Sequence, residues 1–244
     1  MSQPTALATA LAALSGYHAT NHNSNRTMHA LQDAVLAVRP LRTFEGAHGR
    51  VWAMTGLDTL SSTRRVPGDP AIIAVAFRKD LLACAYTLHA MTFPTEALAT
   101  CWLGSRGIPL AKLKPSAGYA RVTDELSHQM ECRIIRSADR FDVLDHRTTR
   151  ATEREVWVLF RDLAPEGRDP YLLQVETTLP DSTTYTVREG RFATRSGALD
   201  WISNRPGPLP SSDWAELLPP GHTAIRHSAL HRAFNAARAT TAAA

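Results

Sequence analysis

Residues 28–41 read MHALQDAVLAVRPL, and residues 95–110 read TEALATCWLGSRGIPL. Both stretches open on an Ala-Leu pair, carry a Leu five residues later and an Arg three residues after that, and end in Pro-Leu. In the first, apolar residues recur at intervals of three and four, which predicts an amphipathic helix over 28–39 that Pro40 ends. The second predicts a helix that begins after Thr95 as its N-cap.

Similar segments follow each of these two stretches. RVWAMTGLD (50–58) and AIIAVAF (71–77) follow the first, whereas EVWVLFRDL (155–163) and YLLQVETTLP (171–180) follow the second. A turn with Gly and Pro joins each pair, which is typical of an antiparallel hairpin. The sequence therefore predicts an α+β fold in which helices pack on an antiparallel sheet, built from two pseudo-repeated helix-strand-strand units.

We expect residues 1–185 to form a single α+β domain with an internal duplication over about 27–82 and 95–180. Residues 186–244 are rich in proline and turn-forming residues and end in an amphipathic helix over 223–238. We expect this C-terminal segment to pack on the same domain.

Three further segments complete the predicted elements. A first helix is expected over residues 4–15, ended by Gly16. IPLAKLKPSAGYARV (108–122) is predicted to be a strand. In MECRIIRSADRFDVLDHRTTR (130–150) apolar residues alternate, which predicts a pair of strands.

The chain has 244 residues, of which 44% are hydrophobic and 20% are charged, as is ordinary for a soluble globular protein. Its formal net charge of +4 comes from Arg residues scattered among acidic ones. No zinc-finger spacing, RRM signature or sustained run of basic and aromatic residues accompanies this charge. We therefore favour a solvated basic surface over a nucleic-acid partner, and a cationic surface also suits a small anionic metabolite.

The three cysteines, Cys84, Cys101 and Cys132, show no CxxC spacing and no pairing pattern, which fits a reducing cytoplasm. Cys101 falls in the helix after Thr95, where a buried structural thiol is favoured over a nucleophile. The N-terminal residues MSQPTALATALAALSGY lack the basic region of a signal peptide and are too short to span a bilayer. We expect a soluble cytoplasmic protein without a membrane partner.

Common catalytic motifs do not occur in the sequence. It has no GxSxG, no P-loop, no GxGxxG and no EF-hand pattern. His18 and His22 lie near each other, but no carboxylate stands at ligand spacing, so we expect no metal site. The pattern favours cofactor-free chemistry or simple binding.

The stretch EGRDPYLLQVETTLPDSTTY (166–185) resembles the chorismate lyase-like superfamily, which includes chorismate pyruvate-lyases and the UTRA effector domains of GntR-type repressors. In that family Gly-x-Pro leads into an apolar strand and then Glu-x-x-Leu-Pro. NSNRTMHALQ (23–32) is similar to the helix entry of the family. The resemblance covers residues 20–185. It implies an antiparallel sheet made of two related halves, with helices packed on one side.

The resemblance also implies a reaction, in which pyruvate is eliminated from chorismate to give 4-hydroxybenzoate without a metal or an organic cofactor. In lyases of this family a Glu on the last long strand and an Arg on an earlier strand hold the substrate. Glu176 matches that Glu, whereas Met54 stands at the position of the Arg. Arg161, Arg50 or Arg78 would then have to supply the guanidinium.

A comparison of the two apolar strands, made without the resemblance, also points to Glu176. When AIIAVA and YLLQVE are aligned after their Asp-Pro pairs, Glu176 stands opposite Ala76. A carboxylate in an apolar strand must be paired or protonated, which suits general acid–base catalysis. The alternative is that Gln174, Glu176 and Thr178, which share one face, form the solvated side of an edge strand.

We assign Glu176 as the candidate acid–base residue and Arg161 as the candidate carboxylate clamp. An Arg binds a carboxylate through two parallel hydrogen bonds. The alternative for Arg161 is a surface ion pair with Asp162 or Glu155. The candidate substrate-binding residues are Arg50, Arg78, Gln174, Thr178 and His146.

Three functions stay open at this point. The first is a cofactor-free carbon–oxygen lyase acting on a small anionic metabolite. The second is a non-catalytic sensor like a UTRA domain, although the residues before the first repeat are too few for the winged helix that normally precedes one. The third is a partner protein whose C-terminal segment docks on another chain or on a second copy, as in a homodimer.

Overall fold

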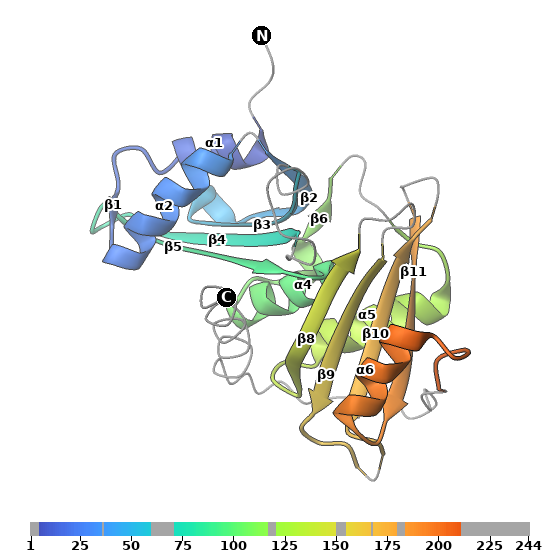
Figure 1. The fold of residues 1–244 in the computed structure, drawn as a ribbon. Helices are drawn as coiled ribbons and strands as arrows, with labels where there is room; N and C mark the ends of the chain where they lie inside the picture. The colour runs from blue at the N-terminus through green and yellow to red at the C-terminus, as the bar shows by residue number, and fades with distance from the viewer. Residues whose placement is uncertain are drawn as a thin grey trace. The chain divides into compact units, whose positions relative to one another are not determined.

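The computed structural model describes residues 5–35, 37–59, 71–116, 121–149, 155–166, 168–179 and 184–210. They belong to two compact units, unit 1 at Met1–Tyr119 and unit 2 at Ala120–Ala244. Each unit has its own β-sheet with helices packed on it (Figure 1). The predicted α+β class is confirmed, but two sheets replace the single antiparallel sheet. Among the described helices, none has the length and apolar character needed to cross a membrane.

Unit 1 contains a six-stranded mixed sheet in the order β1-β5-β4-β3-β2-β6. Its four long strands, β2 to β5, are antiparallel to their neighbours, and β1 runs parallel to β5. The elements are α1 (Ala6–Ala12), β1 (His18–Ala19), α2 (His22–Ala34), β2 (Val38–Glu45), β3 (Val51–Asp58), β4 (Ile72–Asp80), β5 (Ala85–Phe93), α4 (Glu96–Ser105) and β6 (Lys114–Pro115), with 3-10 turns at Ala47–Gly49 and Leu110–Lys112.

Alternate residues of β3 face opposite sides of the unit 1 sheet. Trp52 and Met54 are buried on one side, in a core that includes Met28 of α2 and residues of α1. Thr55 points to the other side, where its hydroxyl donates to Glu96 Oε1 of α4 at 3.1 Å. The sheet is therefore covered by α1 and α2 on one face and by α4 on the other.

Unit 2 contains a five-stranded sheet in the order β7-β11-β10-β9-β8. Its strands β8 to β11 are antiparallel, and β7 runs parallel to β11. The elements are β7 (Arg121–Val122), α5 (Glu125–Arg136), β8 (Phe141–Thr149), β9 (Glu155–Asp162), β10 (Tyr171–Thr178), β11 (Thr184–Phe192) and α6 (Arg195–Asn204).

The unit 2 sheet is also covered on both faces. Trp157 and Val175 are buried with Ala198 of α6 on one face. Met130 of α5 is buried with Val187 of β11 on the other. The second face is the one that carries the polar network described below.

The two units repeat one order of elements. In each, a two-residue strand leads into a helix, four antiparallel strands follow, and a last helix closes the unit. The short strand lies parallel beside the fourth long strand in both cases, β1 beside β5 and β7 beside β11. The repeat thus runs over 18–105 and 121–204, with boundaries different from those that the sequence suggested.

A buried serine marks equivalent positions in the two units. Ser24 and Ser127 lie in the first turn of α2 and α5. Ser24 Oγ accepts a hydrogen bond from the backbone N of Leu88 at 3.1 Å, and Ser127 Oγ accepts one from the backbone N of Val187 at 2.8 Å. Each hydroxyl ties the helix to the last strand, so Leu88 corresponds to Val187.

Two more features fix the correspondence. The first long strand of each repeat has a shift in its pairing register at the same place. The shift lies between Pro40 and Arg42 in β2 and between Val143 and Asp145 in β8. An ion pair then joins this strand to the last helix. It is Arg42–Glu96 at 2.9 Å in unit 1 and Asp145–Arg195 at 3.9 Å in unit 2, with the signs of the charges exchanged.

This correspondence corrects the predicted alignment of the repeats. The helix after Thr95 corresponds to α6 and not to α2, and both α4 and α6 begin after a threonine N-cap, Thr95 or Thr194. Leu88 pairs with Phe77, and Val187 pairs with Glu176. Glu176 therefore corresponds to Phe77 rather than to Ala76.

Several predicted elements also differ from the structure. The helix predicted over 28–39 is α2, which begins after Asn21 and ends at Ala34, while Pro40 lies in β2. The first half of the strand pair predicted over 130–150 belongs to helix α5. Among the described residues of 108–122, which leave out 117–120, strand is confined to Lys114–Pro115 and Arg121–Val122.

The predicted boundary near residue 185 falls inside β11, and α6 follows that strand. The helix predicted over 223–238 lies outside the described residues. Hairpins β3-β4 and β9-β10 pair as the sequence predicted.

Candidate functional site

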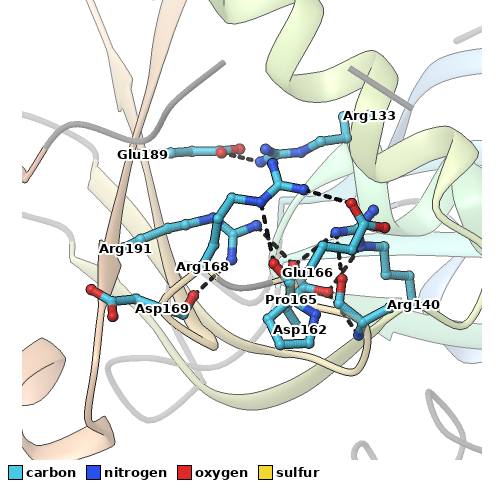
Figure 2. A network of polar contacts seen from close by, with 10 residues as sticks. Arg133, Arg140, Asp162, Pro165, Glu166, Arg168, Asp169, Glu189 and Arg191 are labelled. Carbon is cyan, nitrogen blue, oxygen red and sulfur yellow. Dashed lines mark hydrogen bonds and ion pairs between the residues drawn. The ribbon is translucent and has the colours of Figure 1, made fainter. Parts of the chain in front are cut away.

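A network of charged side chains lies in unit 2 between α5 and the sheet (Figure 2). Its members come from α5, from the turn before β8, and from β9, β10 and β11. We call it the arginine network, and its residues are Arg133, Arg140, Asp162, Gln174, Glu189 and Arg191.

Glu189 is one of the two carboxylates of the arginine network, with a side chain that is 0% exposed. One of its oxygens accepts a hydrogen bond from Gln174 Nε2 at 2.8 Å, and the other forms an ion pair with Arg133 Nη2. Burial raises the pKa of Glu189, although Arg133 and Gln174 act in the opposite direction. This carboxyl group is thus held closer to its protonated form than an exposed glutamate.

Asp162 is the second buried carboxylate, at the end of β9. It accepts from Arg140 Nε and Nη2 at 2.9 and 3.0 Å, and from Arg191 Nη2 at 2.8 Å. Burial alone would raise the pKa of Asp162, but the hydrogen bonds from Arg140 and Arg191 outweigh it and hold this pKa below the ordinary value. The pKa values of the two carboxyl groups in the network are therefore shifted in opposite directions, that of Glu189 upward and that of Asp162 downward.

The guanidinium groups are held by additional contacts. Arg191 Nη1 donates to the carbonyl of Asp169 at 2.8 Å, and Arg140 Nη2 donates to the carbonyl of Ala164 at 2.8 Å. Arg133 and Arg140 lie over the ring of Phe141, at 5.6 and 5.5 Å from its centroid. Such contacts fix the planes of the guanidinium groups.

The network reaches from the interior to the surface. Arg168 and Glu166 form an ion pair at 3.1 Å in the β9–β10 loop, and the Glu166 side chain is 62% exposed. Figure 2 shows this pair beside the buried residues. Exposure falls from Glu166 through Arg168 to Arg140 and Glu189. The β9–β10 loop is therefore the solvent side of the network.

Unit 1 has uncharged residues at five of the six corresponding positions, and Asp58 stands at the position of Asp162. Because Leu88 corresponds to Val187 and Ser24 to Ser127, the counterparts follow from the strand register and the helix spacing. The counterparts of Arg133, Arg140, Gln174, Glu189 and Arg191 are Ala30, Ala37, Val75, Ala90 and Thr92.

This difference between the units shows which of the buried charges the fold does not require. Buried ion pairs replaced by packed apolar residues are often neutral or stabilising, so charges in the interior are weak evidence for a role in stability. Unit 1 shows that this fold forms without the three arginines and without Glu189. Three guanidinium groups face two carboxylates, which leaves one positive charge in excess, since 3 − 2 = 1.

The structure does not bring the two predicted catalytic residues together. Glu176 is half-buried on β10, whereas Arg161 is exposed on β9 and pairs with Tyr171, five positions away along β10. Arg161 also faces the opposite side of the sheet, because its neighbour Asp162 points into the arginine network. A joint role for Glu176 and Arg161 has no geometric basis.

The predicted substrate-binding residues are dispersed. Gln174 is 2% exposed and belongs to the arginine network, and Thr178 is half-buried on the same strand. His146 lies half-buried on β8, opposite Val158. Arg50 and Arg78 are exposed residues of unit 1.

Sequence reasoning found Gln174 but missed the charged residues around it. Glu189 and Arg191 alternate along β11 in the segment TVREGRF, which had been assigned no strand. Arg133 lies on a segment that was predicted to be a strand and is a helix. The available signal was the alternation of Glu189 and Arg191 with Val187, which places the three side chains on one face.

In the part of the chain that the structure describes, no three His, Cys, Asp or Glu side chains gather in a way that would hold a metal ion. Comparison with known proteins finds no matching family model, no matching curated protein and no matching solved structure.

Proposed function

We propose that unit 2 binds a small anionic metabolite at the arginine network and that Glu189 exchanges a proton with it, without a cofactor. The observation that carries this proposal is the contrast between the units. Unit 1 builds the same fold with Ala30, Val75 and Ala90 where unit 2 has Arg133, Gln174 and Glu189. Charges that the fold does not require are candidates for binding or catalysis.

The guanidinium groups supply the anion-binding chemistry. Arg133, Arg140 and Arg191 each present a planar fork that matches a carboxylate or a phosphate. Their excess positive charge favours one further anionic group in the network. An incoming carboxylate would take one of the hydrogen-bond positions that Asp162 or Glu189 now fills.

Glu189 is the group suited to proton transfer in this proposal. Its raised pKa brings the carboxyl group closer to neutral pH, where it can both accept and release a proton. Gln174 orients one of its oxygens through the 2.8 Å hydrogen bond. The acid–base role first assigned to Glu176 therefore passes to Glu189.

The narrower form of the proposal is the elimination that the chorismate lyase-like resemblance implies. In that reaction the carboxylate of Glu189 accepts the ring proton, and the ring carbon–oxygen bond breaks. The electrons of the carbon–hydrogen bond complete the aromatic ring of 4-hydroxybenzoate. The enolpyruvyl group leaves and takes a proton to become pyruvate.

Two assays test the two levels of the proposal. Thermal shift with a panel of small carboxylates and phosphates tests binding, and incubation with chorismate followed by detection of 4-hydroxybenzoate tests the elimination. We expect stabilisation by at least one anion. Binding without product would make the site a sensor, and a panel in which nothing binds would contradict the proposal.

A further inference from the structure

The turn between β4 and β5 exposes apolar side chains. Leu82 is 100% exposed and Leu81 is 39% exposed, and Cys84 beside them is also exposed. The carboxylate of Asp80 accepts hydrogen bonds from the backbone N of Leu82 and of Ala83, both at 3.0 Å. These bonds fix the turn with its leucines outside the core.

Cationic side chains gather at the base of this turn. Arg78 and Lys79 precede it on β4, and the backbone N of Lys79 donates to the carbonyl of Arg50 at 2.8 Å. Arg78 Nη2 donates to the carbonyl of Arg106 at 3.3 Å, which brings a fourth cation to this end of the sheet. Arg50 and Arg78 are exposed.

Positive charge prevails around the turn. Among the described residues, Glu45 ends β2 at this end of the sheet, and the carboxylate of Asp80 is engaged by the turn amides. A partner for this surface must combine an apolar part with negative charge. A second copy of unit 1 does not meet this condition, because a symmetric contact through Leu82 would bring the cations of both copies together.

The apolar side chains of the turn lie beyond the cationic ones of β4, and in a lipid surface the hydrocarbon lies beneath the phosphates. A strand advances about 3.3 Å per residue, so Leu82 lies at most about 10 Å beyond Lys79. An anionic bilayer presents phosphates outside and hydrocarbon beneath them. We infer that the 81–84 turn docks unit 1 on an anionic lipid surface, with Leu81 and Leu82 entering between headgroups and Arg50 and Arg78 binding phosphates.

This inference is independent of the unit 2 site and replaces the expectation of no membrane partner. It is tested by sedimentation of the full chain with vesicles of phosphatidylglycerol mixed with phosphatidylcholine, and with vesicles of phosphatidylcholine alone. We expect binding to the anionic vesicles that decreases with added salt. Arg78→Ser should weaken it about fivefold.

Leu82→Asp is the decisive variant, and because Leu82 is 100% exposed the fold does not depend on it. It should weaken binding to anionic vesicles about tenfold or more. Leu126→Asp is the matched control, since Leu126 is an exposed leucine of α5, at 37%, and lies far along the sequence from the turn. We expect Leu126→Asp to bind vesicles more tightly than Leu82→Asp does.

Three results would overturn the inference. The first is no sedimentation with anionic vesicles. The second is equal loss of binding in Leu82→Asp and Leu126→Asp, which would indicate a nonspecific effect of added negative charge. The third is a lipid-free dimer that depends on Leu82 in sedimentation velocity, because a second copy would then cover the turn.

Discussion

Arg133 and Glu189 form an ion pair, and their side chains are 10% and 0% exposed. Each charge is therefore compensated by its partner and not by water. Removing one partner of a buried pair leaves an uncompensated charge, which costs about 3–5 kcal/mol. We expect Arg133→Met to lower the free energy of unfolding by about this amount. Urea denaturation of the variant and the wild type measures the difference.

The matched variant removes the charges of both partners. Replacing Arg133, Gln174 and Glu189 by Met, Leu and Leu gives a unit 2 that resembles unit 1 at these positions. Apolar substitution of both partners of a buried ion pair is often neutral or stabilising. This triple variant should therefore unfold within about 1.5 kcal/mol of the wild type. A triple variant as unstable as Arg133→Met would show that the network maintains the fold.

The pH dependence of stability reports the raised pKa of Glu189, whose main cause is burial. A carboxyl group with a folded-state pKa above its unfolded value of about 4.3 contributes stability below that value. It loses this contribution as the pH rises through the folded-state pKa. The wild type should therefore lose stability relative to Glu189→Gln as the pH rises from about 4. Parallel pH profiles in urea denaturation would contradict this expectation.

At the scale of single residues, the sequence predicted part of the candidate site. Alternation correctly placed Gln174 and Glu176 on one face of β10, but it did not show that α5 covers that face. The partners of Gln174 come from segments far along the chain, Arg133 before it and Glu189 after it. Such convergence depends on tertiary packing, and the pattern of one strand does not contain it.

Helix α5 offers a test at the scale of one element. Asp124 is its N-cap and accepts from the backbone N of Ser127 at 2.8 Å, and this bond with that of Arg188 lowers the pKa of Asp124 to about 2. A depressed carboxyl pKa gives stability that is present above the unfolded value and lost as the pH falls through the folded one.

The test compares Asp124→Asn with the wild type. Asparagine caps the corresponding helix of unit 1 through Asn21, so the cap should be kept. We expect the wild type to lose stability relative to Asp124→Asn as the pH falls from about 4 to about 2. Asp124→Ala should cost about 1 kcal/mol at neutral pH. Thermal melts at several pH values measure both, and identical pH profiles would refute the assignment of the cap.

Elements with a clear apolar pattern were predicted correctly, whereas segments whose apolar spacing fits both a strand and a helix were not. The hairpins β3-β4 and β9-β10 carry apolar runs bounded by turn residues, and both form. Residues 130–136 contain Cys132 and Ile134 at alternate positions, which suggested a strand. The Asp124 cap and the apolar spacing of Met130 and Ile134 fix a helix there instead.

At the scale of the whole molecule, each unit has an ion pair between its first long strand and its last helix, and the two units place the positive and the negative partner on opposite elements. Arg42–Glu96 joins β2 to α4, and Asp145–Arg195 joins β8 to α6. Reversing one charge, as in Glu96→Arg, should destabilise the protein by about 1–3 kcal/mol, because Glu96 also accepts from buried Thr55.

The double variant Arg42→Asp with Glu96→Arg reproduces the arrangement of unit 2. It should recover part of the loss caused by Glu96→Arg, as a double-mutant cycle in urea would show. If the double variant is less stable than Glu96→Arg alone, the two ion pairs are not equivalent. The correspondence of the units would then rest on the strand register and on the hydrogen bonds of Ser24 and Ser127.

The repeat also explains why function is assigned to one unit. Unit 1 has apolar residues such as Val75 and Ala90 in its core, whereas unit 2 has Gln174 and Glu189 of the arginine network at the equivalent positions. The sequence revealed a repetition but aligned it on the wrong helices. The correct alignment required the strand register and the hydrogen bonds of Ser24 and Ser127.

Isothermal titration calorimetry of small carboxylates and phosphates, chorismate among them, against two proteins tests the central claim most directly. The proteins are the wild type and the triple variant that carries Met, Leu and Leu at positions 133, 174 and 189. We predict that the wild type binds at least one of these anions, and that the triple variant, folded and of similar stability, binds the same anion more weakly. Equal binding by both proteins, or no binding by the wild type, would contradict the account.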